Sequence, residues 1–264
     1  ESTFRFLVKE GSQFRDIRFE VRAIDNKDKR DPTPAALTIP VKNTPPKAAF
    51  QEGTPAVDTA FTVLSLSWET GDPDGDESLD SAFIKANEGA WVPVSRFTEI
   101  VTLVPQSPRS PGETSATLLE GLEASNDIGT LPGVNLGEAN TFYLKATDIA
   151  GATSNIDTLG PIHIRPQQSD LLVLAASTGS FPDPREVYRP ILDEVYGTYD
   201  YIDLFANEQQ YLPQFWSAAF AKRLNLYDKV FMFADDNTID QELLLESASS
   251  ALQQYLNQEG HLFI

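Results

Sequence analysis

The hydrophobic and polar positions follow two different patterns along this chain. Up to about residue 166, short segments alternate apolar and polar side chains and are separated by Pro, Gly, Asn and Asp, which is typical of half-buried β-strands. In one segment Leu64, Leu66 and Trp68 alternate with serines, so the pattern predicts one apolar face and one hydroxyl face. From Ser169 onward, continuous apolar runs alternate with helical repeats, which predicts a parallel sheet covered on both faces.

An internal repeat divides the chain into modules. The segment Phe19–Asp25 matches Phe142–Asp148 in pattern, and each is followed by a polar turn and a closing strand. Proline-rich joints come next, at Asn43–Pro46 and Arg165–Gln168, and such joints are typical of domain boundaries. The pattern therefore predicts three segments, namely the tail of a truncated β-sandwich module (residues 1–45), a complete sandwich (residues 46–166) and an α/β domain (residues 167–264).

The second segment resembles the fibronectin type III and related immunoglobulin-like modules of bacterial secreted and surface proteins. The resemblance lies in Leu64–Trp68, which is similar to the family's second strand with its core tryptophan, and in Leu119–Leu122 and Thr141–Gly151. It implies an all-β, immunoglobulin-like sandwich. Because the segment is longer than the ~100 residues typical of such modules, we predict that the Gly- and Asn-containing stretch Glu123–Gly137 is an inserted loop.

The third segment reads as alternating strands and helices. We predict strands at Asp170–Ala176, Tyr199–Phe205, Lys229–Ala234 and His261–Ile264. Between them we predict helices that begin at Asp183, Pro213 and Thr238 and end at Gly197, Leu224 and Gly260. In the first helix Asp183 is the expected N-cap, Pro190 is expected to cause a kink, and the apolar stripe consists of Val187, Ile191, Leu192 and Val195.

This third segment is similar to class I glutamine-amidotransferase-like domains, through the strand pattern of Leu226–Ala234 and the helix ending at Tyr255–Gly260. The resemblance implies a three-layer, flavodoxin-like α/β domain with a parallel sheet, of which this chain holds the incomplete N-terminal half. Enzymes of that family use a cysteine nucleophile. This chain contains no cysteine, so a glutaminase activity is not supported.

Composition narrows the choice of partners. The 264 residues include 39 acidic and 20 basic side chains, for a net charge of −19, and this length is compatible with about two domains. A chain so acidic is repelled by phosphate backbones and anionic headgroups, so we expect neither nucleic acid binding nor direct membrane insertion. The acidity belongs to residues 50–264, because residues 1–49 carry more basic than acidic side chains. Without cysteine, disulfide scaffolds and cysteine-ligated metal sites are excluded.

One loop is a candidate metal site. Asp72, Asp74 and Asp76 stand at alternate positions in the turn Gly71–Ser78, and several carboxylate oxygens on a tight turn are what a calcium ion prefers. The helix–loop–helix calcium pattern itself fails, because its sixth position is Glu77 where glycine is needed. The alternative is a solvated turn between strands, in which Pro and Gly set the geometry.

Four other features have a functional and a structural interpretation. The loop of small residues Ala176–Ser180 is a possible anion-binding site or a plain connection between elements. The segment Asp235–Asn237 is a possible ligand-binding site, or it precedes the N-cap Thr238 and its negative charge favours the helix N-terminus. His163 and His261 lack partners at motif spacing, so we expect packing or surface roles. Trp91, which follows Gly89 and Ala90, is a candidate for a carbohydrate platform.

These observations together favour a non-catalytic region of a secreted or cell-surface bacterial protein. The sandwich modules would act as spacers or adhesion units toward a protein or glycan partner, and the α/β part would be a docking domain. No cofactor is expected apart from calcium. One alternative is part of an extracellular hydrolase whose catalytic residues lie beyond residue 264, and another is a calcium- or carbohydrate-binding module. The oligomeric state stays open.

Overall fold

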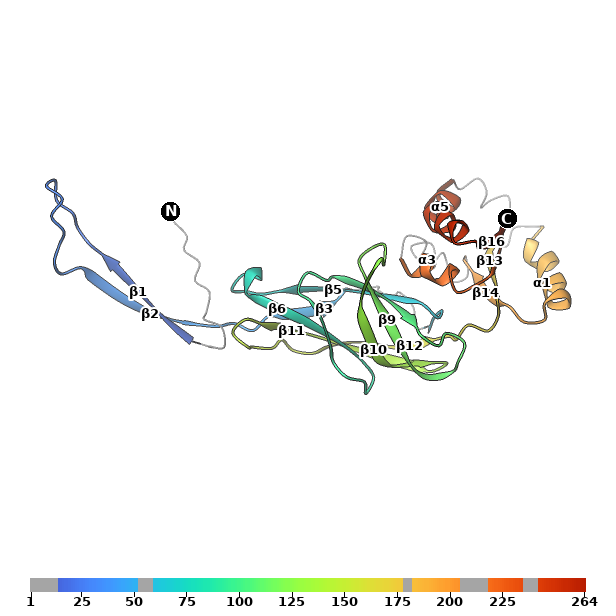
Figure 1. Cartoon of the computed structure of the whole chain (residues 1–264), viewed down its shortest axis with the longest axis horizontal. Helices are drawn as coiled ribbons and strands as arrows, with labels where there is room; N and C mark the ends of the chain where they lie inside the picture. The colour runs from blue at the N-terminus through green and yellow to red at the C-terminus, as the bar shows by residue number, and fades with distance from the viewer. Residues whose placement is uncertain (1–13, 52–58, 178–181, 205–217, 235–241) are drawn as a thin grey trace.

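A computed structural model describes residues 14–51, 59–177, 182–204, 218–234 and 242–264 of this chain. Three bodies follow one another along the long axis of the molecule (Figure 1). A two-stranded hairpin lies at one end, a pair of β-sheets lies in the middle, and a mixed α/β body lies at the other end. The prediction of a chain rich in β-structure with some helices is therefore confirmed.

The first body is an antiparallel hairpin of β1 (Phe14–Val21) and β2 (Ala35–Lys42), paired from Phe14 opposite Lys42 to Val21 opposite Ala35. Its side chains are mostly exposed, and Ile17 is the buried apolar residue. The hairpin contributes no residue to the main hydrophobic cores of the described chain. It is consistent with two strands of a module, but it has no second sheet to pack against in the described residues.

The second body consists of two five-stranded sheets. One has the order β10-β9-β8-β5-β3 and comprises β3 (Lys47–Phe50), β5 (Leu64–Gly71), β8 (Ile100–Pro105), β9 (Gly112–Glu120) and β10 (Asn126–Leu136). The other has the order β4-β12-β11-β6-β7 and comprises β4 (Thr59–Ala60), β6 (Leu79–Ala86), β7 (Val92–Ser95), β11 (Ala139–Asp148) and β12 (Asp157–Ile164). Both sheets contribute to one core, so they form a β-sandwich.

The expected alternation is seen in the sandwich core. Leu66 and Trp68 of β5 are fully buried against residues such as Phe142 of β11. The alternating serines Ser65 and Ser67 are also buried, and Ser65 shares a hydrogen bond of 2.8 Å with Thr102 of β8. This hydroxyl face is covered because a helix of the third body contacts both β5 and β8.

The predicted loop at Glu123–Gly137 is wrong, because most of it forms β10, which pairs with β9. Its Leu131, Val134 and Leu136 are fully buried. Gly129 and Gly133 have φ angles of 134° and 83° and lie at two irregularities in the pairing with β9. The glycines that favoured a loop therefore mark β-bulges, which interrupt the alternation without ending the strand.

The third body has a parallel four-stranded sheet of order β14-β13-β15-β16. Its strands are β13 (Leu171–Ala176), β14 (Asp200–Asp203), β15 (Lys229–Ala234) and β16 (His261–Phe263), and its helices are α1 (Pro184–Val195), α3 (Ala218–Leu224) and α5 (Glu242–Asn257). Alternate residues of β13 point to opposite faces: Val173 packs with α1, whereas Leu172 packs with α3 and α5. The sheet is thus covered on both faces, as the continuous apolar run predicts.

Helix α1 begins as predicted. The Asp183 side chain accepts a hydrogen bond from the Arg185 backbone N–H, and Pro184 is the first helical residue. Pro190 lies inside the helix, and Gly197 follows it with φ 69°. The predicted starts of the other two helices, at Pro213 and Thr238, lie outside the described residues.

The predicted apolar stripe of α1 is only partly covered in the described structure. Leu192 is buried, but Val187, Ile191 and Val195 are 55, 51 and 68% exposed. The helix contacts the sheet along a narrower line than its apolar residues cover, because no described element packs on its other side.

Candidate functional site: the joint between the sandwich and the α/β body

Phe61, which directly follows β4 of the sandwich, packs in the core of the α/β body. Its side chain is 8% exposed and belongs to the same cluster as Phe220 and Leu224 of α3. A residue from one body that completes the core of the other cannot move independently of it. The two bodies are therefore joined by packing as well as by the chain.

Two guanidinium groups lie against the same ring. Arg223 of α3 is 4% exposed, and its guanidinium carbon is 5.3 Å from the centroid of Phe61. The guanidinium of Arg165, in the chain joint, is 5.4 Å from that centroid. Arg223 also donates a hydrogen bond of 2.9 Å from Nη2 to the Val63 carbonyl. A cation near an aromatic ring and a buried hydrogen bond to a main-chain carbonyl together fix the angle at which α3 meets the sandwich.

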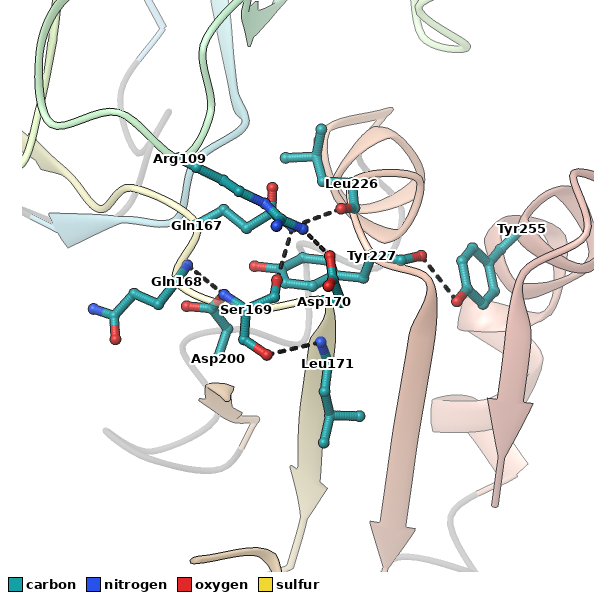
Figure 2. A network of polar contacts seen from close by, with 10 residues as sticks. All are labelled: Arg109, Gln167, Gln168, Ser169, Asp170, Leu171, Asp200, Leu226, Tyr227 and Tyr255. Carbon is teal, nitrogen blue, oxygen red and sulfur yellow. Dashed lines mark hydrogen bonds and ion pairs between the residues drawn. The ribbon is translucent and has the colours of Figure 1, made fainter. Parts of the chain in front are cut away.

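The linker itself is bound on both sides through Gln167, which is buried. Its backbone N–H donates to the Pro108 carbonyl of the sandwich at 2.8 Å. Its side-chain Nε2 donates to the carbonyls of Ser169 and Leu226 at 2.8 and 2.6 Å (Figure 2). Leu226 follows α3, so one glutamine connects the sandwich, the linker and the α/β body.

Asp200, at the start of β14, holds the next part of the linker. Its Oδ2 accepts hydrogen bonds from the backbone N–H groups of Gln168 and Ser169, at 2.9 and 3.3 Å (Figure 2). Burial raises the pKa of the nearby Tyr227 phenol, and the negative charge of Asp200 raises it further. The Tyr227 phenol therefore stays neutral, as a buried structural group does.

A more exposed ion pair closes the joint at its surface. Arg109, in the loop between β8 and β9, pairs with Asp170, the residue before β13 (Figure 2). Both side chains are about half exposed, so this pair contributes little free energy by itself. The joint therefore depends mainly on the buried contacts of Phe61, Gln167 and Arg223.

The polar groups of this joint bond to backbone and to one another. Their contacts position two bodies, and they include no arrangement of a nucleophile beside a base among the described residues. Sequence reasoning missed Phe61 and Arg223. Phe61 lies in the apolar stretch before Leu64, and its place outside the sandwich core is seen only in the fold.

The predicted calcium residues lie at the opposite end of the sandwich, in and beside the short 3₁₀ turn η1 (Asp76–Ser78). Asp72 is buried, Asp74 is half-buried and Asp76 is exposed. Their carboxylates accept backbone hydrogen bonds within the turn: Asp72 from the Asp74 N–H at 2.7 Å and Asp76 from the Asp72 N–H at 3.3 Å. Burial raises the pKa of Asp72, against the hydrogen bonds that lower it.

A charged cluster occupies the carboxyl edge of the parallel sheet. The Arg185 guanidinium pairs with Asp183 at 2.9 Å and with Asp203, the last residue of β14, at 2.8 Å. Burial opposes ionisation of Asp183, but the hydrogen bonds from Arg185 and Ser177 outweigh it and lower the pKa of Asp183. This cluster lines an open cleft of about 410 Å³. Arg185 bridges the two carboxylates, so the cluster braces the start of α1 against β14.

The remaining predicted residues do not gather at one site. His163 makes a 2.8 Å hydrogen bond from Nε2 to the Gly137 carbonyl, and His261 is an exposed residue of β16. Trp91 is half-exposed on the sandwich, with the ammonium groups of Lys85 and Lys145 at 5.7 and 4.6 Å from its ring centroid. Two predicted sites, the tip of the loop Ala176–Ser180 and Asp235–Asn237, fall on residues outside the described ranges.

An apolar groove runs beside α1 on the α/β body. It has a volume of about 310 Å³ and lies between the helix and the edge of the sheet, with most of its lining apolar: Leu171, Tyr188, Ile191, Leu192, Tyr196, Lys229, Phe231 and Phe263. The exposed Val195 lies about one helical turn after Ile191, which lines the groove. Contiguous exposed apolar surface of this kind is typical of protein-binding sites.

No family model, curated protein or solved structure matches this chain.

No helix among the described residues combines the length and apolar character that a membrane span requires. No three side chains of His, Cys, Asp or Glu in the described ranges gather closely enough to hold a metal ion.

Proposed function

We propose that this chain is a non-catalytic region of a secreted or cell-surface protein, in which a β-sandwich holds an α/β docking domain in a fixed orientation. The order β4-β12-β11-β6-β7, with β5 and β8 paired in the facing sheet, supports a sandwich of the immunoglobulin or fibronectin type III kind. The β9–β10 hairpin is an addition at the edge of that arrangement. The parallel order β14-β13-β15-β16 supports a flavodoxin-like topology.

The observation that carries this proposal is the buried joint. A flexible linker would suffice if the sandwich only connected two independent domains. Instead Phe61 packs into the margin of the α/β core, Arg223 binds the sandwich backbone, and Gln167 bonds to both bodies. A spacer that fixes both distance and direction is useful where the carried domain must meet a partner from one side.

The apolar groove beside α1 is the face that such a domain would present. Its occupant is a protein that supplies an apolar helix or strand, because the groove offers aromatic and aliphatic surface with one basic residue, Lys229, at its rim. A glycan would need more hydrogen-bonding groups than this lining provides.

Site-specific photo-crosslinking in the native host tests the proposal. A photoreactive phenylalanine analogue is placed at Ile191, in the groove, and in a control at Gln254, on the exposed polar face of α5. We expect a discrete crosslinked protein from position 191 and none from position 254. We also expect protease added to intact cells to digest the chain. Equal crosslinking from both positions, or complete protection from the protease, would contradict the proposal.

A further inference from the structure

Three segments meet at the end of the sandwich that lies away from the α/β body. They are the linker that follows β2, the turn after β5 and the end of β11. The Asn43 Nδ2 donates to Asp148 Oδ2 at 2.6 Å, and the Thr44 N–H donates to Asp74 Oδ2 at 2.6 Å. The Ile149 N–H donates to the Ser78 carbonyl at 2.8 Å, which ties the two sandwich segments together.

Two carboxylates are buried in this place without a basic partner. Asp72 is 8% exposed and Asp148 is 3% exposed, and neither takes part in an ion pair within the described part of the chain. The Asp72 Oδ1 accepts the Asp74 N–H, but its Oδ2 is fully covered and has no hydrogen-bond partner in the described structure. Burying the ionised Asp72 carboxylate with one oxygen unpaired costs desolvation free energy, which a bound cation would offset.

The third polar group is the side chain of Asn43, which is 4% exposed and reaches the same place from the linker. The Asn43 Nδ2 faces Asp148, so Asn43 offers an oxygen ligand there after a half-turn of its amide, which exchanges Nδ2 and Oδ1. Asp148 Oδ1 also accepts the Ala152 N–H at 2.7 Å, which leaves its other lone pair for a cation. The polar set is thus two carboxylates and one amide. Oxygen donors with two negative charges are the ligands that a calcium ion prefers, and main-chain carbonyls and water commonly complete its shell. Zinc and other thiophilic metals are disfavoured, since the chain has no cysteine.

We infer that a calcium ion binds between Asp72 and Asp148, with Asn43 as a third ligand, and fixes the β1–β2 hairpin to the sandwich. The ion would lie between the linker that follows β2 and the sandwich, and not within the turn. Asp74 and Asp76 therefore keep their roles as acceptors of backbone hydrogen bonds. This ligand set differs from the three alternate aspartates of the sequence pattern. It does not depend on the proposed docking function of the α/β body.

Thermal unfolding and calorimetric titration with calcium chloride test this inference. The whole chain is first stripped with a chelator, and sodium and magnesium chloride at matched ionic strength provide the baseline for charge screening. We expect a Kd in the range of about 10⁻⁴ to 10⁻³ M, as is typical of extracellular calcium modules. At calcium concentrations about a hundredfold above that Kd, we expect the Tm of the sandwich to rise by about 5 to 10 °C.

Three variants locate the site. Asp72→Asn should abolish the calcium-dependent rise in Tm, and Asn43→Ala should weaken calcium binding about tenfold or more. Asp80→Asn removes one negative charge from an exposed position on β6 and should leave the response unchanged. In the presence of chelator, Asp72→Asn should unfold at a higher temperature than the wild type, which also shows that this variant folds.

The inference is overturned by any of three results. The first is a wild-type response to calcium no larger than the response to magnesium at equal ionic strength. The second is an equal calcium response in Asp72→Asn and the wild type. The third is an equal loss of response in Asp80→Asn and Asp72→Asn, since that would reflect net charge and not a site.

Discussion

Truncating one side chain of the sandwich, by Phe61→Ala, should destabilise the α/β body. Burying a phenylalanine side chain contributes about 1.5–3 kcal/mol, and Phe→Ala changes in cores cost about 3–5 kcal/mol because a cavity is left. Phe61 lies at the margin of the α/β core and is 8% exposed, which places the cost at the lower end, about 3 kcal/mol. For a body of this size we expect the Tm to fall by on the order of 10 °C.

Differential scanning calorimetry measures this effect, and the chain provides a matched control. Phe97 is also a sandwich phenylalanine beside a guanidinium, that of Arg96 at 4.6 Å from its ring centroid, but it is 76% exposed. Phe97→Ala should therefore leave the α/β transition almost unchanged. If Phe61→Ala lowers the Tm of the α/β transition no more than Phe97→Ala does, the reasoning about the joint is refuted.

Three further predictions concern the joint, a strand and a helix cap. Arg223→Met should lower the free energy of unfolding by about 2–4 kcal/mol, because the Val63 carbonyl loses a buried hydrogen bond. Lys222→Met, on the same helix, should lower it by less than about 0.5 kcal/mol, and urea denaturation measures both. Gly133→Ala should lower the free energy of unfolding by about 2–4 kcal/mol, since the new Cβ would lie 2.8 Å from the Ala86 carbonyl oxygen. Gly151→Ala, at a similar φ but in open space, should lower it by about 1 kcal/mol. Equal losses in the two variants would contradict the role of Gly133 in β10. Asp183→Asn should cost about 1 kcal/mol at pH 7. Because the folded protein holds the pKa of Asp183 below its ordinary 3.8, this difference should be present above that pH and disappear as the pH falls through the folded-state value; a difference that persists in acid would show that charge is not its cause.

The elements that the sequence predicted best are those whose pattern is local. The run Lys229–Ala234 is a strand with the predicted bounds, because a continuous apolar run between polar turns admits few other structures. The Asp183–Pro184 start of α1 and the burial of Trp68 were also predictable, since caps and strict alternation are read from a few neighbouring residues.

The features that the sequence did not predict depend on contacts between distant segments. Glycines interrupt the alternation in β10, so their role as bulges is visible only when β9 is paired beside them. The α1 stripe has the composition of a buried face, and nothing in the helix itself says how much of that face is covered. The joint brings together Phe61 and Arg223, which lie far apart in the chain.

The buried polar set at the other end of the sandwich shows the same limit. The alternate aspartates of the turn are conspicuous in the sequence, yet Asp148 and Asn43 join Asp72 only through the fold. Spacing along the chain identifies ligands that lie in one loop. It does not identify polar groups that come together from a linker, a turn and a strand.

A distance measurement between the two bodies tests the central claim of a fixed joint most directly. Since the chain contains no cysteine, spin labels attach cleanly to the pair Glu88→Cys in the sandwich and Gln254→Cys in α5, and pulsed electron resonance gives the distance distribution. The account predicts one narrow distribution in the wild type and a broad one after Phe61→Ala. A broad distribution in the wild type would contradict it, because the sandwich and the α/β body would then move independently.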